Sequence, residues 1–405
     1  MSTTALDVRQ HFPSLASGFA YLENAGGSQV PASVIRKVTE YFENSYVQLG
    51  AGYPASITAT ETVAKAHTFV NRLMNGEAVG KTVLGSSTTS LLCMLSNCYQ
   101  KVLKPGDEVI VGECGHEGNI TPWLPLQDAG IVIRWWKPAS AEDGLPISGL
   151  KQLLSEKTRI VAFPQVSNLL GQVYDVEAIT KLAHEAGAKV VVDGVAYAAH
   201  APVDVEKWGC DWYVYSCYKV YGPHMAALFG REDAFEPLTG PNHFFLPDTV
   251  PYKFQIGGAN HEGCAGLLGT LEYLNLLGGA SPEAEADTTT IHRAFKQMRS
   301  MEIPVQAALL DFLRDHPAYA VVGHGESTSD RVPTVGFRHR TMKPVDVVAQ
   351  VDKKGIGIRW GHMYSYRLCE ALGIPTDEGV VRASAVHYNT VEEVQRLCQV
   401  LEEIG

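Results

Sequence analysis

The chain has 405 residues, 45% of them hydrophobic, and a formal net charge of −11 at pH 7. This acidic balance argues against nucleic acid or an anionic membrane as a partner, although a local pocket can still bind a small anion. No run approaches the roughly 18 apolar residues that a bilayer-spanning helix needs, and the polar first ten residues lack the apolar core of a signal peptide. We therefore expect a cytoplasmic globular protein. The eight cysteines show no zinc-ligand spacing, so no metal site is expected.

Short apolar runs alternate with amphipathic segments through the first two-thirds of the chain. One of these segments, residues 176–186, is a predicted helix that Asp175 caps and Gly187 ends. The alternation predicts an α/β fold, in which a mostly parallel sheet lies between helices and ligands bind at the carboxyl ends of the strands. Strands are predicted at residues 108–111, 131–136, 159–163, 189–192, 212–215 and 226–229.

The pattern changes after about residue 280. Residues 282–301 and 305–315 predict two helices, and residues 391–404 predict a last one. Strands are predicted between them at residues 319–322, 334–338 and 356–360. These elements predict a second, smaller α/β unit, with which residues 1–19 are expected to pack.

Lys219 lies in the turn Ser-Cys-Tyr-Lys-Val-Tyr-Gly-Pro at residues 216–223, directly after a predicted strand. Upstream, Asp193 ends the apolar run of residues 190–192. A lysine in such a turn and a carboxylate at a strand end suit an enzyme that uses pyridoxal 5'-phosphate. The lysine would hold the cofactor aldehyde as a Schiff base, and the aspartate would keep the pyridine nitrogen protonated, so that the ring accepts electrons from a substrate α-carbon.

Small hydroxylated residues, Ser86 to Ser90, follow a strand end at Gly85 and open a helical pattern. Free N–H groups at a helix N-terminus, together with hydroxyls, form an anion site. The alternative is plain helix capping. Because Lys219 and Asp193 occur in the same chain, we interpret Ser87, Thr88 and Thr89 as a phosphate-binding loop.

Three more side chains follow predicted strands or precede the last helix. His116 could stack on a planar cofactor and move protons, and the alternative is a polar loop histidine. Asn168 could bind the phenolic oxygen of the cofactor, and the alternative is a turn asparagine. Arg382 could bind a substrate carboxylate through two hydrogen bonds, with Arg359 as a second candidate, and the alternative is a surface ion pair.

In order and spacing these motifs resemble the class V aminotransferase and cysteine desulfurase family of fold-type I pyridoxal phosphate enzymes. The resemblance begins at Tyr-Leu-Glu-Asn-Ala-Gly-Gly, residues 21–27, and covers nearly the whole chain. It implies a mostly parallel seven-stranded sheet between helices, in a large cofactor-binding domain of residues 20–275. It also implies a small α/β domain of residues 1–19 and 276–405, and a homodimer with the active site at the subunit interface.

The resemblance also assigns roles. By the resemblance, Lys219 forms the Schiff base, Asp193 contacts the pyridine nitrogen and His116 stacks on the cofactor ring. Independently of the resemblance, we expect Tyr364 and His116 to be the acids or bases that choose between the possible reactions. Arg382, Arg359 and Asn24 would contact the substrate, and the partner subunit would contribute the segment around Gly258. The expected cofactor-binding residues are Ser87, Thr88, Thr89, His116, Asn168, Asp193, Ser216, Lys219 and Gly258.

Three positions depart from the family pattern. Tyr364 stands where cysteine desulfurases carry the cysteine that accepts sulfur, and a phenol cannot form a persulfide. Ala196 replaces a glutamine that usually contacts the cofactor, so one hydrogen bond is missing or comes from elsewhere. Gly258 replaces a threonine of the segment that contacts phosphate across the dimer. This variant pattern resembles a subfamily whose members need not be desulfurases.

The sequence therefore predicts an enzyme that binds a small amino acid through the cofactor and acts at its α-carbon. Burial and a nearby cation are expected to lower the pKa of Lys219, so that it can take or return the α-proton. β- or γ-elimination of the C–S lyase type is the first interpretation. Mannich-type cyclisation or α-alkylation, epimerisation and transamination remain open. A non-catalytic scaffold is a further alternative, against which the retained lysine argues.

Overall fold

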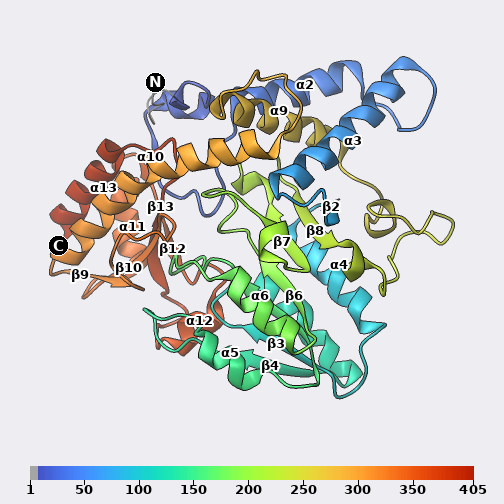
Figure 1. Cartoon of the computed structure of the whole chain (residues 1–405). Coiled ribbons are helices and arrows are strands. Elements are labelled where there is room, and N and C mark those ends of the chain that lie inside the picture. The colour runs from blue at the N-terminus through green and yellow to red at the C-terminus, as the bar shows by residue number, and fades with distance from the viewer. Residues whose placement is uncertain (1–7) are drawn as a thin grey trace.

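The computed structural model describes residues 8–405 (Figure 1). The chain forms a seven-stranded sheet at the centre of the larger unit, a four-stranded sheet near the C-terminus and a two-stranded ribbon. Within residues 8–405, no helix combines the length and apolar character that crossing a membrane requires.

Six of the seven strands of the large sheet run in the same direction, so their carboxyl ends lie at one edge. The strand β8 (Ala226–Arg231) is antiparallel to both of its neighbours, and the other pairs are parallel. This confirms the predicted mostly parallel sheet. The strand order is β2 (Gly80–Gly85), β8, β7 (Trp212–Ser216), β6 (Lys189–Asp193), β5 (Thr158–Pro164), β3 (Glu108–Gly112) and β4 (Val132–Trp136).

Helices cover both faces of this sheet, which explains the continuous apolar runs of its strands. Val191 of β6 packs in one core cluster with α4 (Thr88–Gln100) and the 3₁₀ helix η3 (Thr121–Ala129). Val190 and Val192 point to the opposite face. The helices on that face include α3 (Pro54–Leu73), α5 (Ile147–Leu153), α6 (Val176–Glu185) and α9 (His261–Leu277), and α2 (Ala32–Asn44) packs against α9.

The smaller unit contains an antiparallel sheet in the order β12, β13, β10, β9, covered by helices (orange to red in Figure 1). The short strand β11 (Ile356–Gly357) instead pairs in parallel with β1 (Ala20–Tyr21) from the start of the chain. The elements of this unit are α10 (Thr288–Asp315), β9 (Tyr319–Val322), β10 (Thr334–His339), α11 (Pro344–Asp352), β12 (Arg359–Gly361), α12 (Tyr366–Ala371), β13 (Val380–Ser384) and α13 (Val391–Ile404).

Two predictions about this unit are wrong. The helices predicted at residues 282–301 and 305–315 are one helix, α10, which runs through Pro304. Its N-terminal half packs Met298 into the core of the large sheet, and its C-terminal half packs Leu309 into the core of the small sheet. Burial on both sides of the proline outweighs the lost hydrogen bond. The strand predicted at residues 356–360 is two strands, β11 and β12, which join different sheets.

The N-terminal segment contacts both units. Arg9 forms an ion pair with Glu393 of α13 at 2.9 Å, and the ring of Phe12 packs against those of Tyr273 and Tyr388. The division into domains at residues 20–275 and 276–405 stays a prediction. Residues 1–7 of the predicted small domain lie outside the described residues.

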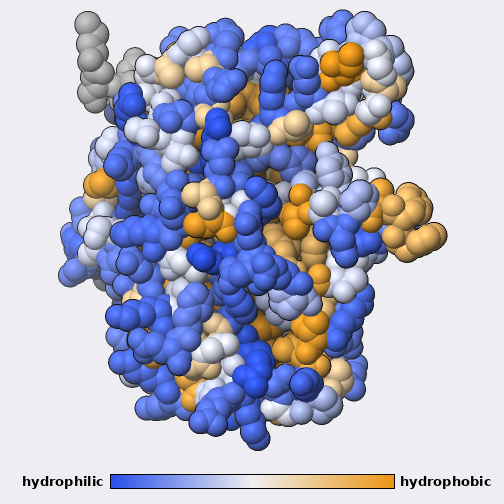
Figure 2. All heavy atoms as spheres, turned by 45° about the vertical axis from the view of Figure 1, so that its right-hand side comes forward, coloured by the Kyte–Doolittle hydropathy of each residue, from blue (hydrophilic) through white to orange (hydrophobic). Residues whose placement is uncertain are grey.

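Short elements complete the chain. A loop between α8 and η5 projects from the body at the right of Figure 1. It carries Phe244, which is 94% exposed, and Phe245, which is 69% exposed. Figure 2 shows apolar side chains gathered on one side of the molecule and projecting at its edge. The short elements are η1 (Pro13–Ser17), η2 (Glu117–Asn119), α7 (Val205–Trp208), η4 (Cys217–Lys219), α8 (Glu232–Phe235) and η5 (Tyr252–Phe254).

Candidate active site

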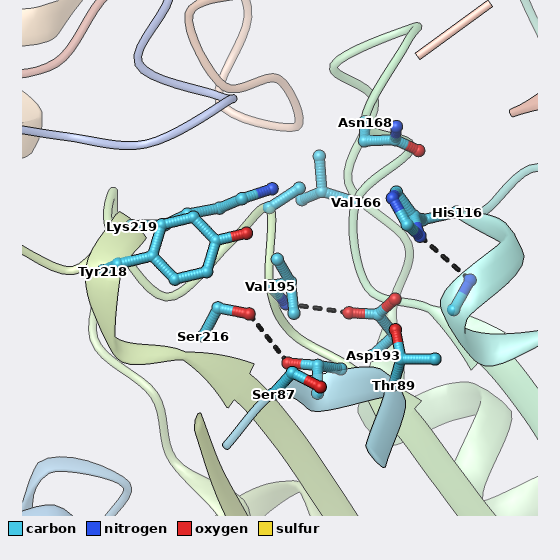
Figure 3. Close-up of a pocket in the computed structure, with 13 residues that line it drawn as sticks. Ser87, Thr89, His116, Val166, Asn168, Asp193, Val195, Ser216, Tyr218 and Lys219 are labelled. Carbon is cyan, nitrogen blue, oxygen red and sulfur yellow. Dashed lines mark hydrogen bonds between the residues drawn. The ribbon is translucent and has the colours of Figure 1, made fainter. Parts of the chain in front are cut away.

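A cavity lies at the carboxyl ends of the central strands, where the sequence placed the ligand (Figure 3). The side chains around it come from segments that follow β2, β3, β5, β6 and β7. It is lined by Ser87, Thr88, Thr89, His116, Gly118, Val166, Asn168, Asp193, Val195, Ala196, Ser216, Tyr218 and Lys219. The structure therefore brings most of the predicted cofactor-binding residues together.

Lys219 ends the single 3₁₀ turn η4 that follows β7. Ser28, from the start of the chain, fixes this turn on both sides of the lysine. The Ser28 hydroxyl donates to the main-chain oxygen of Tyr218 at 3.1 Å and accepts the main-chain N–H of Tyr221 at 3.0 Å. Burial and the charge of Arg382 lower the pKa of Lys219 to about 8, against the opposing effect of Asp193. A substantial fraction of the amine is therefore neutral near physiological pH.

Asp193 ends β6 with its carboxylate turned into the cavity (Figure 3). It is 4% exposed, and Oδ1 accepts the N–H of Val195 at 3.0 Å. Oδ2 has no hydrogen-bond partner among residues 8–405. Because burial disfavours the charged form, the pKa of Asp193 rises to about 6. A buried carboxylate with a free oxygen is suited to a cationic N–H group of a ligand.

The N-terminus of α4 forms the floor of the cavity. Ser87 caps the helix by accepting the N–H of Ser90 at 3.1 Å. The N–H groups of Thr88 and Thr89 have no acceptor within the helix and remain available to an anion. The hydroxyls of Thr88 and Ser216 meet at 2.8 Å (Figure 3). Two hydroxyls and a helix N-terminus at one spot suit a phosphate group.

His116 lines the cavity from the loop after β3. Its Nδ1 accepts the N–H of Gly118 at 2.9 Å, so the neutral ring carries its proton on Nε2. Burial, Lys219 and Arg382 lower the pKa of His116 to about 4. The ring stacks on Tyr364 with centroids 5.0 Å apart and an angle of 24° between the ring planes. Tyr364 is thus next to the site although its ring does not line the cavity.

Asn168 lines the cavity, but its amide is largely engaged elsewhere. Nδ2 donates to the oxygen of Met363 at 2.8 Å, and Oδ1 accepts the hydroxyl of Ser365 at 2.8 Å. One N–H of Nδ2 remains for a ligand. The sequence predicted a contact to the cofactor and did not reveal this connection to the smaller unit.

Arg382 is a buried cation in β13, 4% exposed. Its Nη1 donates to the oxygen of Asn168 at 3.0 Å, and its Nε is buried without a partner. Burial lowers the pKa of Arg382 to about 10, with Glu23 opposing the shift and Arg359 adding to it. A buried guanidinium with a free N–H requires an acceptor, and a substrate carboxylate provides one. Arg359 is more than half exposed and forms an ion pair with Glu23.

Asn24 and Gly258 also do not line the cavity. Asn24 is 4% exposed, and its Nδ2 donates to the oxygens of Tyr21 and Ser384 at 2.8 and 2.9 Å. Its Oδ1 accepts the hydroxyl of Tyr388. The amide of Asn24 thus joins the start of the chain to β13, and its contact with a substrate stays a prediction. Gly258 has a φ of +94° and lies outside the cavity of this chain.

Sequence reasoning missed Tyr218, whose ring lines the cavity beside Lys219 (Figure 3). The ring stacks on His224 with centroids 4.6 Å apart and only 9° between the planes. Its position next to the lysine was the available signal. Ala196 lines the cavity with a methyl group, where the resemblance placed a glutamine. Among the described residues, no cluster of three or more metal-ligating side chains occurs.

The polar groups around the cavity fit pyridoxal 5'-phosphate. The hydroxyls and free N–H groups at α4 match its phosphate, and the open oxygen of Asp193 matches its protonated ring nitrogen. Lys219, with a lowered pKa, matches its aldehyde.

Comparison with known proteins supports this fit. Residues 20–397 match the family described as Aminotransferase class-V. The chain belongs to this family. It is therefore an enzyme of the class that depends on pyridoxal phosphate. It is 37% identical to the aminotransferase-like protein FGM3 of Gibberella zeae, over 98% of each chain.

Cysteine desulfurases are also similar to this class V chain. It is 31% identical to a cysteine desulfurase of Pectobacterium atrosepticum, over 98% of this chain and 97% of the relative. The solved structure of the cysteine desulfurase CsdA from Escherichia coli has a TM-score of 0.83 at 26% identity, and covers 99% of this chain and 98% of that one. The fold and the family expected from the sequence are thus confirmed.

Proposed function

We propose that this class V enzyme catalyses β- or γ-elimination on a small amino acid, releasing a sulfur-containing or similar leaving group. One observation carries the proposal. Lys219 and Asp193 line a single cavity, and the unsatisfied guanidinium of Arg382 lies close enough to lower the pKa of the lysine. A base, a partner for the cofactor ring and a carboxylate anchor are thus present together.

When bound, the cofactor supplies an electron sink for the substrate α-carbon. The chain supplies the remaining functions. The Lys219 amine, with a pKa of about 8, is suited to take and return the α-proton near neutral pH. Arg382 orients the substrate through its carboxylate. Neutral His116 presents a proton on Nε2 that can assist the departing group.

The residues near Tyr364 limit the products. Residues 361–366 read Gly-His-Met-Tyr-Ser-Tyr, so this segment contains no thiol that could accept sulfur. Tyr364 instead stacks on His116. We therefore propose that the leaving group departs as a small molecule and is not transferred to a cysteine of this segment.

The test has two parts. Borohydride reduction of the purified enzyme, followed by peptide mapping, is expected to place the cofactor on Lys219, and an adduct on another lysine would refute the proposal. The enzyme is then incubated with L-cysteine, cystine or cysteine sulfoxides, and pyruvate is measured. Lys219→Ala serves as the inactive control. Cofactor on Lys219 without pyruvate from any of these substrates would leave the cofactor assignment intact and overturn β-elimination. γ-Elimination is tested in the same way with L-homocysteine and L-methionine, from which it would release 2-oxobutyrate, and absence of both oxo acids would overturn the proposal.

A second candidate is transamination or bond formation at the same α-carbon. The observation that favours it is the 37% identity to an aminotransferase-like protein, together with the missing sulfur-accepting cysteine. Exchange of the α-hydrogen for deuterium without pyruvate formation would support this class. An oxo acid matching the added amino acid would then identify transamination.

We also propose a cytoplasmic homodimer whose interface lies beside the site. The segment of Gly258 is held by Gln255, whose side chain accepts the N–H of Leu84 at 2.9 Å. Ile256 in this segment and Phe244 in the preceding loop are exposed, and Asn242 of that loop donates to the main-chain oxygen of Gln255 at 2.6 Å. Light scattering is expected to give twice the chain mass of 44.0 kDa. Phe244→Ser should weaken the dimer, whereas a monomeric parent enzyme would refute this part.

A further inference from the structure

Residues 361–366, here termed the Tyr364 turn, adopt an unusual backbone conformation between β12 and α12. Met363 and Tyr364 have φ values of +52° and +58°, and Gly361 has +121°. Two successive non-glycine residues in the left-handed region are unfavourable for L-amino acids. Such a conformation persists only where surrounding contacts impose it, and it is typical of functional sites.

Contacts from the larger unit help to impose it, beside hydrogen bonds within the turn, in one of which the N–H of Tyr364 donates to Nδ1 of His362 at 3.1 Å. Asn168 holds the oxygen of Met363 through Nδ2 and the hydroxyl of Ser365 through Oδ1, both at 2.8 Å. The main-chain N–H of Glu117 donates to the main-chain oxygen of Tyr364 at 2.8 Å. Three successive residues of the turn are thus bonded to loops that follow β3 and β5.

A side-chain pair reinforces this attachment. Arg367, at the start of α12, forms an ion pair with Glu117 at 3.1 Å and lies over the ring of Trp135 at 4.7 Å from its centroid. Ser365 is 1% exposed, so its hydroxyl has no access to water and depends on Asn168. Hydrogen bonds and an ion pair therefore attach the turn to the wall of the cavity.

The turn determines the surroundings of His116. The imidazole lies between the ring of Tyr364 and the cavity, because His116 lines the cavity and Tyr364 does not. The phenol ring keeps water from one side of the imidazole. Lys219 and Arg382 are the charged groups that lower its pKa, and both are cationic. Water reaching His116 would reduce the burial that keeps it neutral.

We propose that Asn168 and Ser365 are positioning residues that hold the ring of Tyr364 against His116, so that the Tyr364 turn is a fixed wall of the site. The proposal deepens the proposed function, on which it rests for the reaction served. It concerns how the site is maintained and does not depend on the leaving group. Tyr364 then acts through its ring, by shielding His116, and its hydroxyl is not needed for this shielding, which is separate from the acid or base role expected from the sequence.

Hydrogen–deuterium exchange at the C2 position of His116, followed by peptide mass spectrometry against pH, tests this in the purified full-length protein. The method reports the pKa of a histidine and its access to water, and no turnover is needed. Ser365→Ala and Tyr364→Ala should raise the pKa of His116 from about 4 toward its ordinary 6.5 and speed the exchange. Tyr364→Phe keeps the ring and should match the parent protein.

Ser56→Ala is the matched control. Ser56 is also fully buried, and its hydroxyl donates to Gln48 and accepts the N–H of Ala51, far along the chain from the site. It should leave His116 unchanged. The proposal is overturned if Ser365→Ala and Tyr364→Ala give the same His116 titration as Ser56→Ala, or if Tyr364→Phe shifts it as much as Tyr364→Ala. Since Tyr364 is 63% exposed, its variants should fold even if Ser365→Ala does not.

Discussion

Arg382 donates from Nη1 to the main-chain oxygen of Asn168 at 3.0 Å, and its Nε has no partner. The contact holds the guanidinium in place and leaves one edge of it for a ligand. A carboxylate on that edge would satisfy the buried N–H and compensate the charge.

Arg382→Lys should lower kcat/KM for the amino-acid substrate by about 10- to 100-fold, because a lysine cannot reproduce a planar pair of donors. Cofactor binding, followed by visible absorbance, should change little. Arg314→Lys is the control, since Arg314 lies exposed on α10 and is paired with Asp311 and Asp315. Equal losses in the two variants would contradict the assignment of Arg382 as the carboxylate anchor.

Lys219 should make the stability of the cofactor-free protein depend on pH. Its pKa is about 8 in the folded protein and 10.5 as the ordinary value, so the unfolded chain binds more protons between these limits. The free energy of unfolding therefore rises with pH between about 8 and 10.5. Below pH 8 the buried, protonated Lys219 destabilises the folded protein to its full extent. Lys219→Met should unfold at a higher temperature than the parent at pH 7, and this gap should shrink toward pH 10.5. Exposed Lys65→Met should show no such gap in calorimetry.

Asp193→Asn should change stability and cofactor binding in opposite directions. The pKa of Asp193 is about 6 in the folded protein against 3.8 ordinarily, so its charge destabilises the cofactor-free protein progressively as pH rises from 3.8 to 6. The neutral amide should therefore raise the unfolding temperature at pH 7. It should also weaken cofactor binding by about 10- to 100-fold, because the charge-assisted hydrogen bond is lost. Titration with pyridoxal phosphate measures the second effect. A variant that is less stable yet binds normally would refute the role given to Asp193.

Gly194 follows Asp193, and a side chain there has no room. A Cβ would overlap the ring of Tyr213, which is buried and donates to Gln165 at 2.6 Å. Gly194→Ala should cost about 3 kcal/mol of stability through overpacking, measured by urea unfolding. Gly187→Ala is a useful comparison, because Gly187 has a φ of +78° in open space. It should cost about 1 kcal/mol through backbone strain alone. Equal costs would mean that the ring of Tyr213 moves aside.

The central sheet was predictable because its strands are buried on both faces. Runs such as Val190 to Val192 are apolar without alternation, and polar side chains mark where each strand ends. The sequence alone therefore places Lys219, Asp193 and Thr88 on one rim of the sheet. The same local reasoning failed at Pro304, because the helix there is maintained by two separate cores that the sequence does not reveal.

The partners of the asparagines could not be predicted. Asn168 and Asn24 both carry amides in turns, and only long-range contacts separate their roles. Asn168 meets Ser365 across 197 residues, and Asn24 meets Ser384 across 360. The stack of Tyr364 on His116 likewise joins segments that no local pattern relates. Motif spacing identifies which residue types are present, and tertiary contacts decide which of their atoms remain free.

The two hydrogen bonds that the Ser28 hydroxyl forms on either side of Lys219 have a consequence for folding. Gln29, the residue after Ser28, donates its N–H to the hydroxyl of Tyr388 at 2.9 Å. That hydroxyl in turn donates to Oδ1 of Asn24. Residues 24–29 thus connect the turn of Lys219 to Tyr388, near the C-terminus. The Lys219 amine therefore has its final surroundings only when residues 24–29 and Tyr388 are both in place. An unfinished or clipped chain would hold the lysine without its support, and a firmly attached cofactor therefore reports a completed fold.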